Sequence, residues 1–286
     1  MRPAPLRKQF AAEDMPLALA YRDTKSSQCE LPDHLHDWYE LVYVYAGSGV
    51  FFIDRSLYEM KAGDLFLIPG NTIHRAFPEA ANPVTSTALY FSPALVQQTV
   101  YDDFAYLDSF RYCAAHQAYK YTGDEAFGRQ TRTLLDAVHA ELGAFGHGAR
   151  SAARLLLLQL LLLIGRRLQS GGTEGPQTAG PPWMRESMAF IDDRLTETLS
   201  LSLLARRAAV SPAHFSRVFR QLTGLNVTAY ITTKRIVRAK ELLARTDDGI
   251  GEIAARCGFE SLPHFHRVFK RIVGRTPGSY RSEGRF

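Results

Sequence analysis

Short runs of aromatic and β-branched residues, separated by Gly, Asp, Pro and Asn, fill the chain from about residue 21 to 91. The clearest are LVYVY at 41–45, GVFFI at 49–53 and DLFLI at 64–68. Apolar runs of this length bounded by turn residues are typical of β-strands, and many of them at this spacing indicate a sandwich or barrel. Residues 1–91 are therefore predicted to form a β-barrel.

The apolar period lengthens to three and four residues between residues 92 and 168, which predicts helices. The most apolar run of this region is LLLLQLLLLI at 155–164. A membrane span needs about 20 apolar residues, so this shorter run is predicted to be a buried helix. The period is carried first by Phe127, Thr131, Leu134, Leu135, Val138 and Leu142.

A stretch rich in Gly and Pro, QSGGTEGPQTAGPP at 169–182, has no apolar period and is expected to be a flexible linker. The charge changes sign across it. Residues 183–286 hold 18 Lys and Arg against 10 Asp and Glu, whereas residues 1–182 hold 16 against 19. The basic C-terminal part is therefore expected to meet a polyanion.

The basic part contains a repeat with an offset of 50 residues, because HFSRVF at 214–219 recurs as HFHRVF at 264–269. Each copy has the pattern of a helix, a tight turn and a second helix. Ser200 is predicted to cap a helix over 201–208 and Ser211 the next one, with left-handed ends at Gly224 and Gly274. One long helix over 227–245 is predicted to join the copies.

The segments LLARRAAVSPAHFSRVFRQLTG and IGEIAARCGFESLPHFHRVFKRIVGRTPGSYR closely resemble the DNA-binding region of the AraC/XylS family of transcription regulators. The resemblance implies two helix-turn-helix motifs whose second helices enter successive major grooves, about 34 Å apart. It also implies a helical region that dimerises, and a sensor domain before it.

On this resemblance, exposed residues early on each second helix are expected to read bases, with Arg217 and Arg267 as the best candidates for guanine. Residues later on the helices or at their ends are expected to hold phosphates. Pro263 is expected to delay or tilt the second of these helices. The candidate DNA-binding residues are Ser211, Ala213, His214, Ser216, Arg217, Arg220, Ser261, Leu262, His264, His266, Arg267, Lys270 and Arg271, with Arg275 as a further phosphate contact.

Two motifs of the cupin family are matched in the barrel region. HLHDWYE at 34–40 followed by Gly47 fits the first, and Gly63 to His74 fits the second with Asn71 in place of a glycine. Along one extended strand, alternate side chains share a face. His34, His36, Trp38 and Glu40 are therefore expected to converge inside the barrel.

Three interpretations of this cluster remain open. His34, His36, Trp38, Glu40 and His74 could bind a small effector, often a sugar in AraC-type sensors. Three histidines and a carboxylate, His34, His36, Glu40 and His74, could instead hold Fe, Mn, Ni or Zn, in a metal-responsive regulator or a cupin enzyme. The polar groups could also simply satisfy one another.

The sequence thus predicts an α+β multidomain protein. It would contain a cupin-like jelly-roll barrel (1–91), a helical dimerisation segment (92–168), a linker (169–182) and an all-α double helix-turn-helix domain (183–286). We expect a cytoplasmic transcription regulator that is an activator and not an enzyme. No cofactor is assigned, apart from the metal that the barrel cluster could hold. Its expected partners are double-stranded DNA, a small effector, a second copy of the chain and, for an activator, RNA polymerase.

Overall fold

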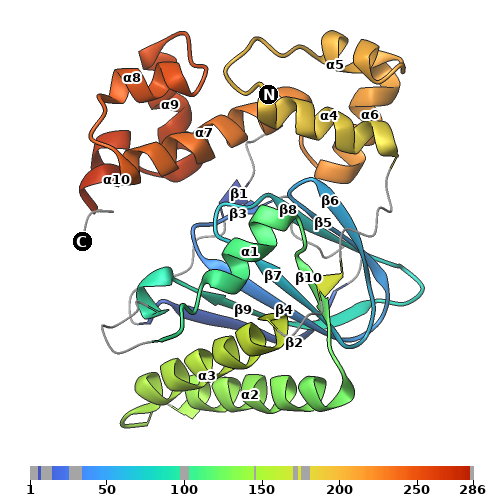
Figure 1. Cartoon of the computed structure of the whole chain (residues 1–286), viewed down its shortest axis with the longest axis vertical. Helices are drawn as coiled ribbons and strands as arrows, with labels where there is room; N and C mark the ends of the chain where they lie inside the picture. The colour runs from blue at the N-terminus through green and yellow to red at the C-terminus, as the bar shows by residue number, and fades with distance from the viewer. Residues whose placement is uncertain are drawn as a thin grey trace. The chain divides into compact units, whose positions relative to one another are not determined.

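The computed structural model describes residues 6–7, 15–25, 34–96, 103–144, 146–169, 173–174 and 181–283. The chain divides into two compact units (Figure 1). Among the described residues, one unit is formed mainly by residues 181–283 and the other mainly by residues 15–25 and 35–174. Each unit buries its own set of apolar side chains.

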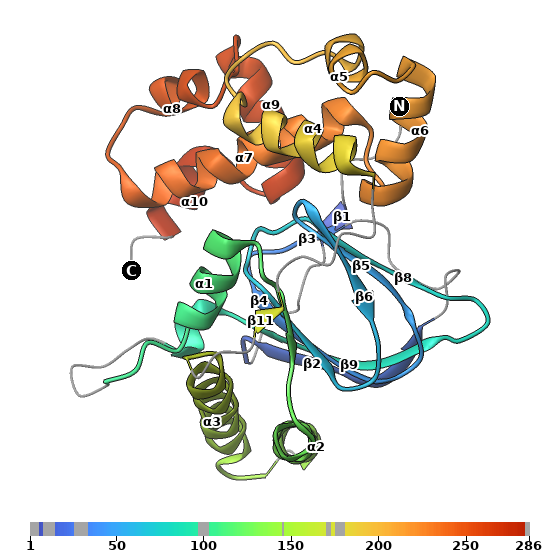
Figure 2. The same ribbon diagram turned by 45° about the vertical axis from the view of Figure 1, so that its right-hand side comes forward.

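The strands form two sheets, with order β1-β3-β8-β5-β6 and β11-β10-β7-β4-β9-β2, which face each other in Figure 2. The pairs β2–β9, β4–β9, β4–β7, β7–β10, β10–β11, β5–β6 and β5–β8 are all antiparallel. The strands are β1 (Leu6–Arg7), β2 (Leu17–Lys25), β3 (His34–Leu35), β4 (Tyr39–Ala46), β5 (Gly49–Ile53), β6 (Ser56–Met60), β7 (Asp64–Ile68), β8 (His74–Pro78), β9 (Val84–Phe91), β10 (Lys120–Thr122) and β11 (Thr173–Glu174). The three predicted strand runs are confirmed as parts of β4, β5 and β7.

Strand β4 shows why these residues form a barrel wall. Its side chains alternate between two covered faces. Val42 lies opposite Phe66 of β7, whose ring packs against Phe51 with 5.0 Å between ring centroids. On the other face Tyr39 contacts Phe110 of helix α1, with centroids 4.9 Å apart. One face therefore lines the barrel and the other carries helices.

The helices of this unit are η1 (Pro93–Val96), α1 (Asp108–His116), α2 (Glu125–Ala144) and α3 (Ala149–Gln169). In Figure 1, α2 and α3 lie side by side along the outer side of the six-stranded sheet. The predicted three- and four-residue period is confirmed in α2, because its buried side chains follow that period. They are Phe127, Thr131, Leu134, Leu135 and Val138, whereas the last predicted position, Leu142, is half-buried.

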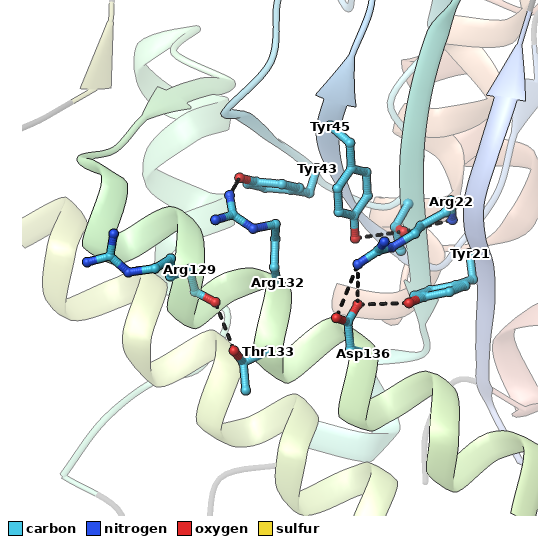
Figure 3. Close-up of polar contacts among 9 residues, drawn as sticks. Tyr21, Arg22, Tyr43, Tyr45, Arg129, Arg132, Thr133 and Asp136 are labelled. Carbon is cyan, nitrogen blue, oxygen red and sulfur yellow. Dashed lines mark hydrogen bonds and ion pairs between the residues drawn. The ribbon is translucent and has the colours of Figure 1, made fainter.

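Polar contacts fasten α2 to the sheet (Figure 3). Arg22 lies at a register shift of β2 with φ +45°, and its guanidinium donates to both carboxylate oxygens of Asp136 on α2, at 3.3 and 3.2 Å. The Tyr21 hydroxyl donates to the same carboxylate at 2.9 Å, and Arg132 donates to the Tyr43 hydroxyl at 2.9 Å. The pairs between arginine and aspartate are half-exposed, so they orient the helix more than they stabilise it.

Helix α3 carries apolar side chains both on the face that packs against its own domain and on a face that stays exposed. Leu157, Leu160, Leu161 and Ile164 are buried, whereas Leu155 is 62% exposed. The prediction of a buried helix therefore holds for one side only. Among the helices that the structure describes, none combines the length and apolarity needed to cross a membrane.

The second unit is helical between residues 182 and 283, and Ser200 and Ser211 cap helices as predicted, each accepting from a backbone N–H three residues on. Gly224 and Gly274 end helices with φ +69° and +82°. The predicted first helix ends one residue early, at Arg207, and the long helix has the predicted bounds. The helices are α4 (Pro182–Asp193), α5 (Leu201–Arg207), α6 (Pro212–Thr223), α7 (Val227–Arg245), α8 (Ile250–Arg256), α9 (Leu262–Val273) and α10 (Pro277–Glu283).

The predicted linker at 169–182 is only partly described. Gln169 is the last residue of α3, Pro182 is the first of α4, and Thr173–Glu174 form strand β11, which pairs with β10. Residues 170–172 and 175–180 lie outside the described residues. The flexible linker therefore stays a prediction, and the described part of this stretch contains one short strand.

A buried ion pair joins β10 to the barrel. Lys120 Nζ lies 3.1 Å from Asp64 Oδ2, and both side chains are fully buried. The aspartate also accepts from the Thr122 hydroxyl and from the Lys61 backbone N–H, each at 2.8 Å. These contacts compensate the cost of burying the carboxylate.

Replacing Lys120 by methionine is expected to destabilise the protein by about 3–5 kcal/mol, because it leaves the Asp64 charge buried without its cation. Denaturant unfolding followed by circular dichroism measures this. The matched control is Lys61→Met, at an exposed lysine, which should change stability by less than about 0.5 kcal/mol. Equal effects of the two variants would contradict the prediction.

Candidate functional site

Three polar side chains meet in the apolar interior of the barrel. His36, Glu40 and His74 are each no more than 3% exposed. Nε2 of His36 and Nε2 of His74 both lie 3.0 Å from the same oxygen, Oε2 of Glu40. Three side chains that could bind a metal or a polar ligand thus converge on one oxygen atom, and the cupin motifs predicted that these three residues converge.

The backbone differs from the predicted single strand. Strand β3 ends at Leu35 and β4 begins at Tyr39, so the chain bends between them. The bend is held by residues of the second motif: the Asn71 N–H donates to the His36 carbonyl at 2.7 Å, and a Cβ on Gly70 would lie 2.4 Å from the Asp37 carbonyl oxygen. The prediction that alternation along one extended strand places these side chains together was therefore wrong, although His36 and Glu40 do meet.

Asn71 occupies the place where the cupin motif has a second glycine. Its φ is +65°, in the left-handed region. Asparagine is one of the few residues with a side chain that enters this region at little cost. The departure from the motif therefore preserves the backbone conformation.

Each imidazole has its Nδ1 directed at a backbone carbonyl. His36 Nδ1 lies 2.7 Å from the Trp38 oxygen, and His74 Nδ1 lies 2.9 Å from the Thr72 oxygen. A carbonyl only accepts, so Nδ1 carries the proton in both rings. In the neutral form, each Nε2 then presents a lone pair to the carboxylate.

Lone pairs that face one another repel unless a cation lies between them or the rings are protonated. Burial alone would raise the pKa of Glu40, but the charges and hydrogen bonds of His74 and His36 outweigh burial and hold this pKa well below its usual value. Glu40 is thus a buried anion. The candidate ligand atoms of the three residues lie within 4.8 Å of one another, which a divalent cation could bridge.

The other predicted members of the cluster are less defined. The side chain of His34 lies outside the described residues. Trp38 is half-buried and contributes its backbone carbonyl to the bond with His36.

Two aromatic residues of this interior were missed by sequence reasoning. Tyr90 lies opposite Glu40 in the β4–β9 register, and its ring meets His36 edge-on at 5.6 Å between centroids. Phe51 meets His74 edge-on at 6.2 Å. Alternation along β9 would have placed Tyr90 on the inner face once the register with Glu40 was known.

The second candidate site is the pair of helices α6 and α9. Each has 12 residues, and each begins at the same point of the 50-residue repeat. Phe215 and Phe265 are buried, whereas Arg217 and Arg267, two residues later, are exposed. The exposed candidate residues are Ser211, Ala213, His214, Arg217, Arg220, Ser261, Leu262, His264, Arg267, Lys270 and Arg271, while Ser216, His266 and Arg275 are half-buried.

Pro263 does not delay α9, which begins at Leu262 with the proline in its first turn, where a missing N–H costs nothing. The expectation of a later start was wrong. The two helices differ instead in their caps, because the Ser211 hydroxyl accepts from the His214 N–H whereas Ser261 makes no such bond. Arg217 is also held by its neighbour, with 3.2 Å between its Nη2 and Nδ1 of His214.

Models of known protein families match both units of the chain. The family model of the AraC-like ligand binding domain matches residues 17–163, which is more than half of the chain. The model of a helix-turn-helix domain matches residues 204–283.

Individual proteins are also similar to this chain. The HTH-type transcriptional activator RhaS of Escherichia fergusonii is 26% identical over 277 residues, which cover 95% of this chain and 94% of the relative. The DNA-binding domain of AdpA, solved with a target DNA, is 35% identical and covers 36% of this chain and 93% of its own, with a TM-score of 0.35. ToxT from Vibrio cholerae is 13% identical and covers 94% of this chain and 97% of its own, with a TM-score of 0.38.

Replacing Glu40 by glutamine is expected to change how stability depends on pH in metal-free protein. The folded-state pKa of Glu40 is lowered, so its ionised form stabilises the fold above the usual value of about 4.5, and that contribution is lost as the pH falls through the lowered value. The difference in unfolding free energy between wild type and Glu40→Gln should therefore shrink below pH 4.5. Chemical unfolding in the presence of a chelator at several pH values measures it.

The control for this series is Glu59→Gln, at an exposed glutamate on β6. It should leave the acid limb of the stability curve unchanged. A difference between wild type and Glu40→Gln that is constant with pH would contradict the assignment of Glu40 as a buried anion.

Proposed function

The chain belongs to the AraC family of DNA-binding transcription regulators, and from this premise we propose that it is an activator controlled by a small effector in its barrel. The observation that carries the proposal is the pair of equal helices α6 and α9, each with a buried apolar side and an exposed basic one. The relative RhaS is a transcriptional activator.

In this proposal α6 and α9 insert into successive major grooves. Arg217 and Arg267 are exposed on the first half of their helices, where a guanidinium can donate two hydrogen bonds to one guanine. Arg220, Lys270 and Arg271 lie further along and would contact phosphates. The uneven charge of the chain, with a net +8 over residues 183–286, supports binding to a polyanion.

We further propose that two copies associate through α3. Its leucines at 155, 156, 158 and 163 are exposed or half-buried within one chain, although they are strongly apolar. A second copy would remove this surface from water. As an activator, the dimer would also contact RNA polymerase.

For the barrel, the first candidate ligand is a carbohydrate. Sugars combine hydroxyls, which the carboxylate of Glu40 and the imidazoles of His36 and His74 can bind, with apolar faces, which rings such as Tyr90 can contact. A specific observation favours a second candidate, a divalent metal. It is the convergence of two Nε2 atoms on one carboxylate oxygen, with all three candidate ligand atoms within 4.8 Å of one another.

Replacing Arg267 by alanine is expected to weaken binding to a specific operator roughly 5- to 150-fold, the loss of one bidentate base contact. Binding to random DNA at the same salt concentration should change far less. Fluorescence anisotropy with both duplexes measures the two affinities. The matched control is Lys270→Ala, which should weaken both to a similar extent and reduce the salt dependence. An equal loss on both duplexes for Arg267→Ala would make it a phosphate contact.

A sugar ligand is expected to raise the melting temperature of the wild type in a thermal-shift screen, because a ligand that binds only the folded state stabilises it by about 2.7 kcal/mol at 100 times its Kd. Glu40→Ala should abolish the shift and Glu59→Ala should keep it. If the shift comes instead from Fe²⁺, Mn²⁺, Ni²⁺ or Zn²⁺, with stoichiometric metal lost in Glu40→Ala and His36→Ala, the metal candidate is supported. Turnover of a small substrate by the metal-loaded protein would contradict a purely regulatory role.

A further inference from the structure

Three segments of the DNA-binding unit meet at Arg235, in the middle of the long helix α7. The side chain is half-buried. Its Nε donates to the Leu195 carbonyl at 2.7 Å, and its Nη2 donates to the Glu197 carbonyl at 2.7 Å. Both acceptors belong to the loop between α4 and α5, which leads into the first helix-turn-helix motif.

The second motif reaches the same point through its turn. Gly258, between α8 and α9, has φ +81°, and a Cβ built on it would lie 2.8 Å from the Leu195 oxygen and 3.0 Å from Cζ of Arg235. Only a glycine fits against these atoms. The lead-in of motif 1, the joining helix and the turn of motif 2 are therefore in direct contact.

This contact is distinct from the covalent connection between the two motifs. Along the chain, α7 is joined to motif 2 by the short segment 246–249, which has no regular structure. A segment of that kind does not by itself fix the orientation of the helices on its C-terminal side. Motif 2 also packs on α7 through α8, α9 and α10, and the Arg235 junction adds polar contacts at the turn that precedes α9.

A pocket of about 300 Å³ lies beside the junction, lined by loop residues such as Thr196 and Thr198 and by Phe259 and Glu260 of the motif 2 turn. The pocket is lined by the loop before α5, by α7, including Arg235, and by motif 2. Burial lowers the pKa of this guanidinium, while the nearby Glu260 carboxylate raises it. The position of the arginine is set by its hydrogen bonds to the two carbonyls.

We propose that Arg235 is a positioning residue that fixes the spacing between α6 and α9, and so determines the distance between operator half-sites that the protein accepts. The inference rests on the proposed function, because spacing has meaning only if both helices bind DNA. One base pair of extra spacing moves a half-site by about 3.4 Å and rotates it around the duplex axis. Two motifs held rigidly cannot follow that movement, whereas two motifs on a loosened junction can.

The test begins with an operator selected from random duplexes by the full-length wild type. Affinities are then measured for the selected operator, for versions with one base pair inserted or removed between its halves, and for a single half-site. Arg235→Met, which removes both donors, should lower the ratio of affinities between native and altered spacing about tenfold. Its affinity for the single half-site should match that of the wild type.

Arg235→Lys and Lys234→Met complete the series. A lysine keeps the charge but lacks the planar fork, so it should recover part of the spacing preference. Lys234, one residue earlier, pairs with Asp192 of α4 at 3.0 Å, and its replacement should leave the preference unchanged.

An unchanged ratio for Arg235→Met overturns the inference. So does an equal loss on the single half-site, which would show that Arg235 only stabilises the unit. A wild type that selects no sequence would instead contradict the proposed function, which separates the two failures.

Discussion

Strand β4 is paired along both edges, to β7 and to β9, and both of its faces are covered. Its register therefore cannot slip by one residue without exchanging the two faces. Such a slip would turn the Glu40 carboxylate out of the barrel and bring Tyr39 or Leu41 in. The same strand also presents the tyrosines that contact α1 and α2. The position of the buried anion and the attachment of the helices thus follow from one pairing register.

The DNA-binding unit is organised around a helix instead of a sheet. Helix α7 buries residues along its whole length, including Tyr230, Ile236 and Leu243, so both motifs have an apolar surface to pack on. At 1.5 Å per residue its 19 residues span about 28 Å, close to the repeat of the major groove. The hydrogen bonds of Arg235 to the Leu195 and Glu197 carbonyls add directional contacts to this packing.

The repeat, the caps and the apolar period were sufficient to predict the helices of the two motifs and the long helix that joins them, because these signals act within a few residues. The strand runs at 41–45, 49–53 and 64–68 were predicted for the same reason. The bend between β3 and β4 was not predicted from the sequence. It depends on contacts of residues 36 and 37 with Gly70 and Asn71, which lie in the loop between β7 and β8. The exposure of Leu155 and the role of Arg235 also escaped prediction. Both depend on which distant segments lie against one helix face.

The bend beside the barrel site is supported by main-chain contacts: the Asn71 N–H binds the His36 carbonyl, and Gly70 packs on the Asp37 carbonyl. The scaffold of the site therefore does not depend on which side chains project from it at positions 36, 40 and 74. Substitutions at these positions can change the chemistry of the interior while the surrounding backbone keeps its shape. In evolutionary terms, a few point mutations at these positions can diversify what the interior holds while the fold stays the same.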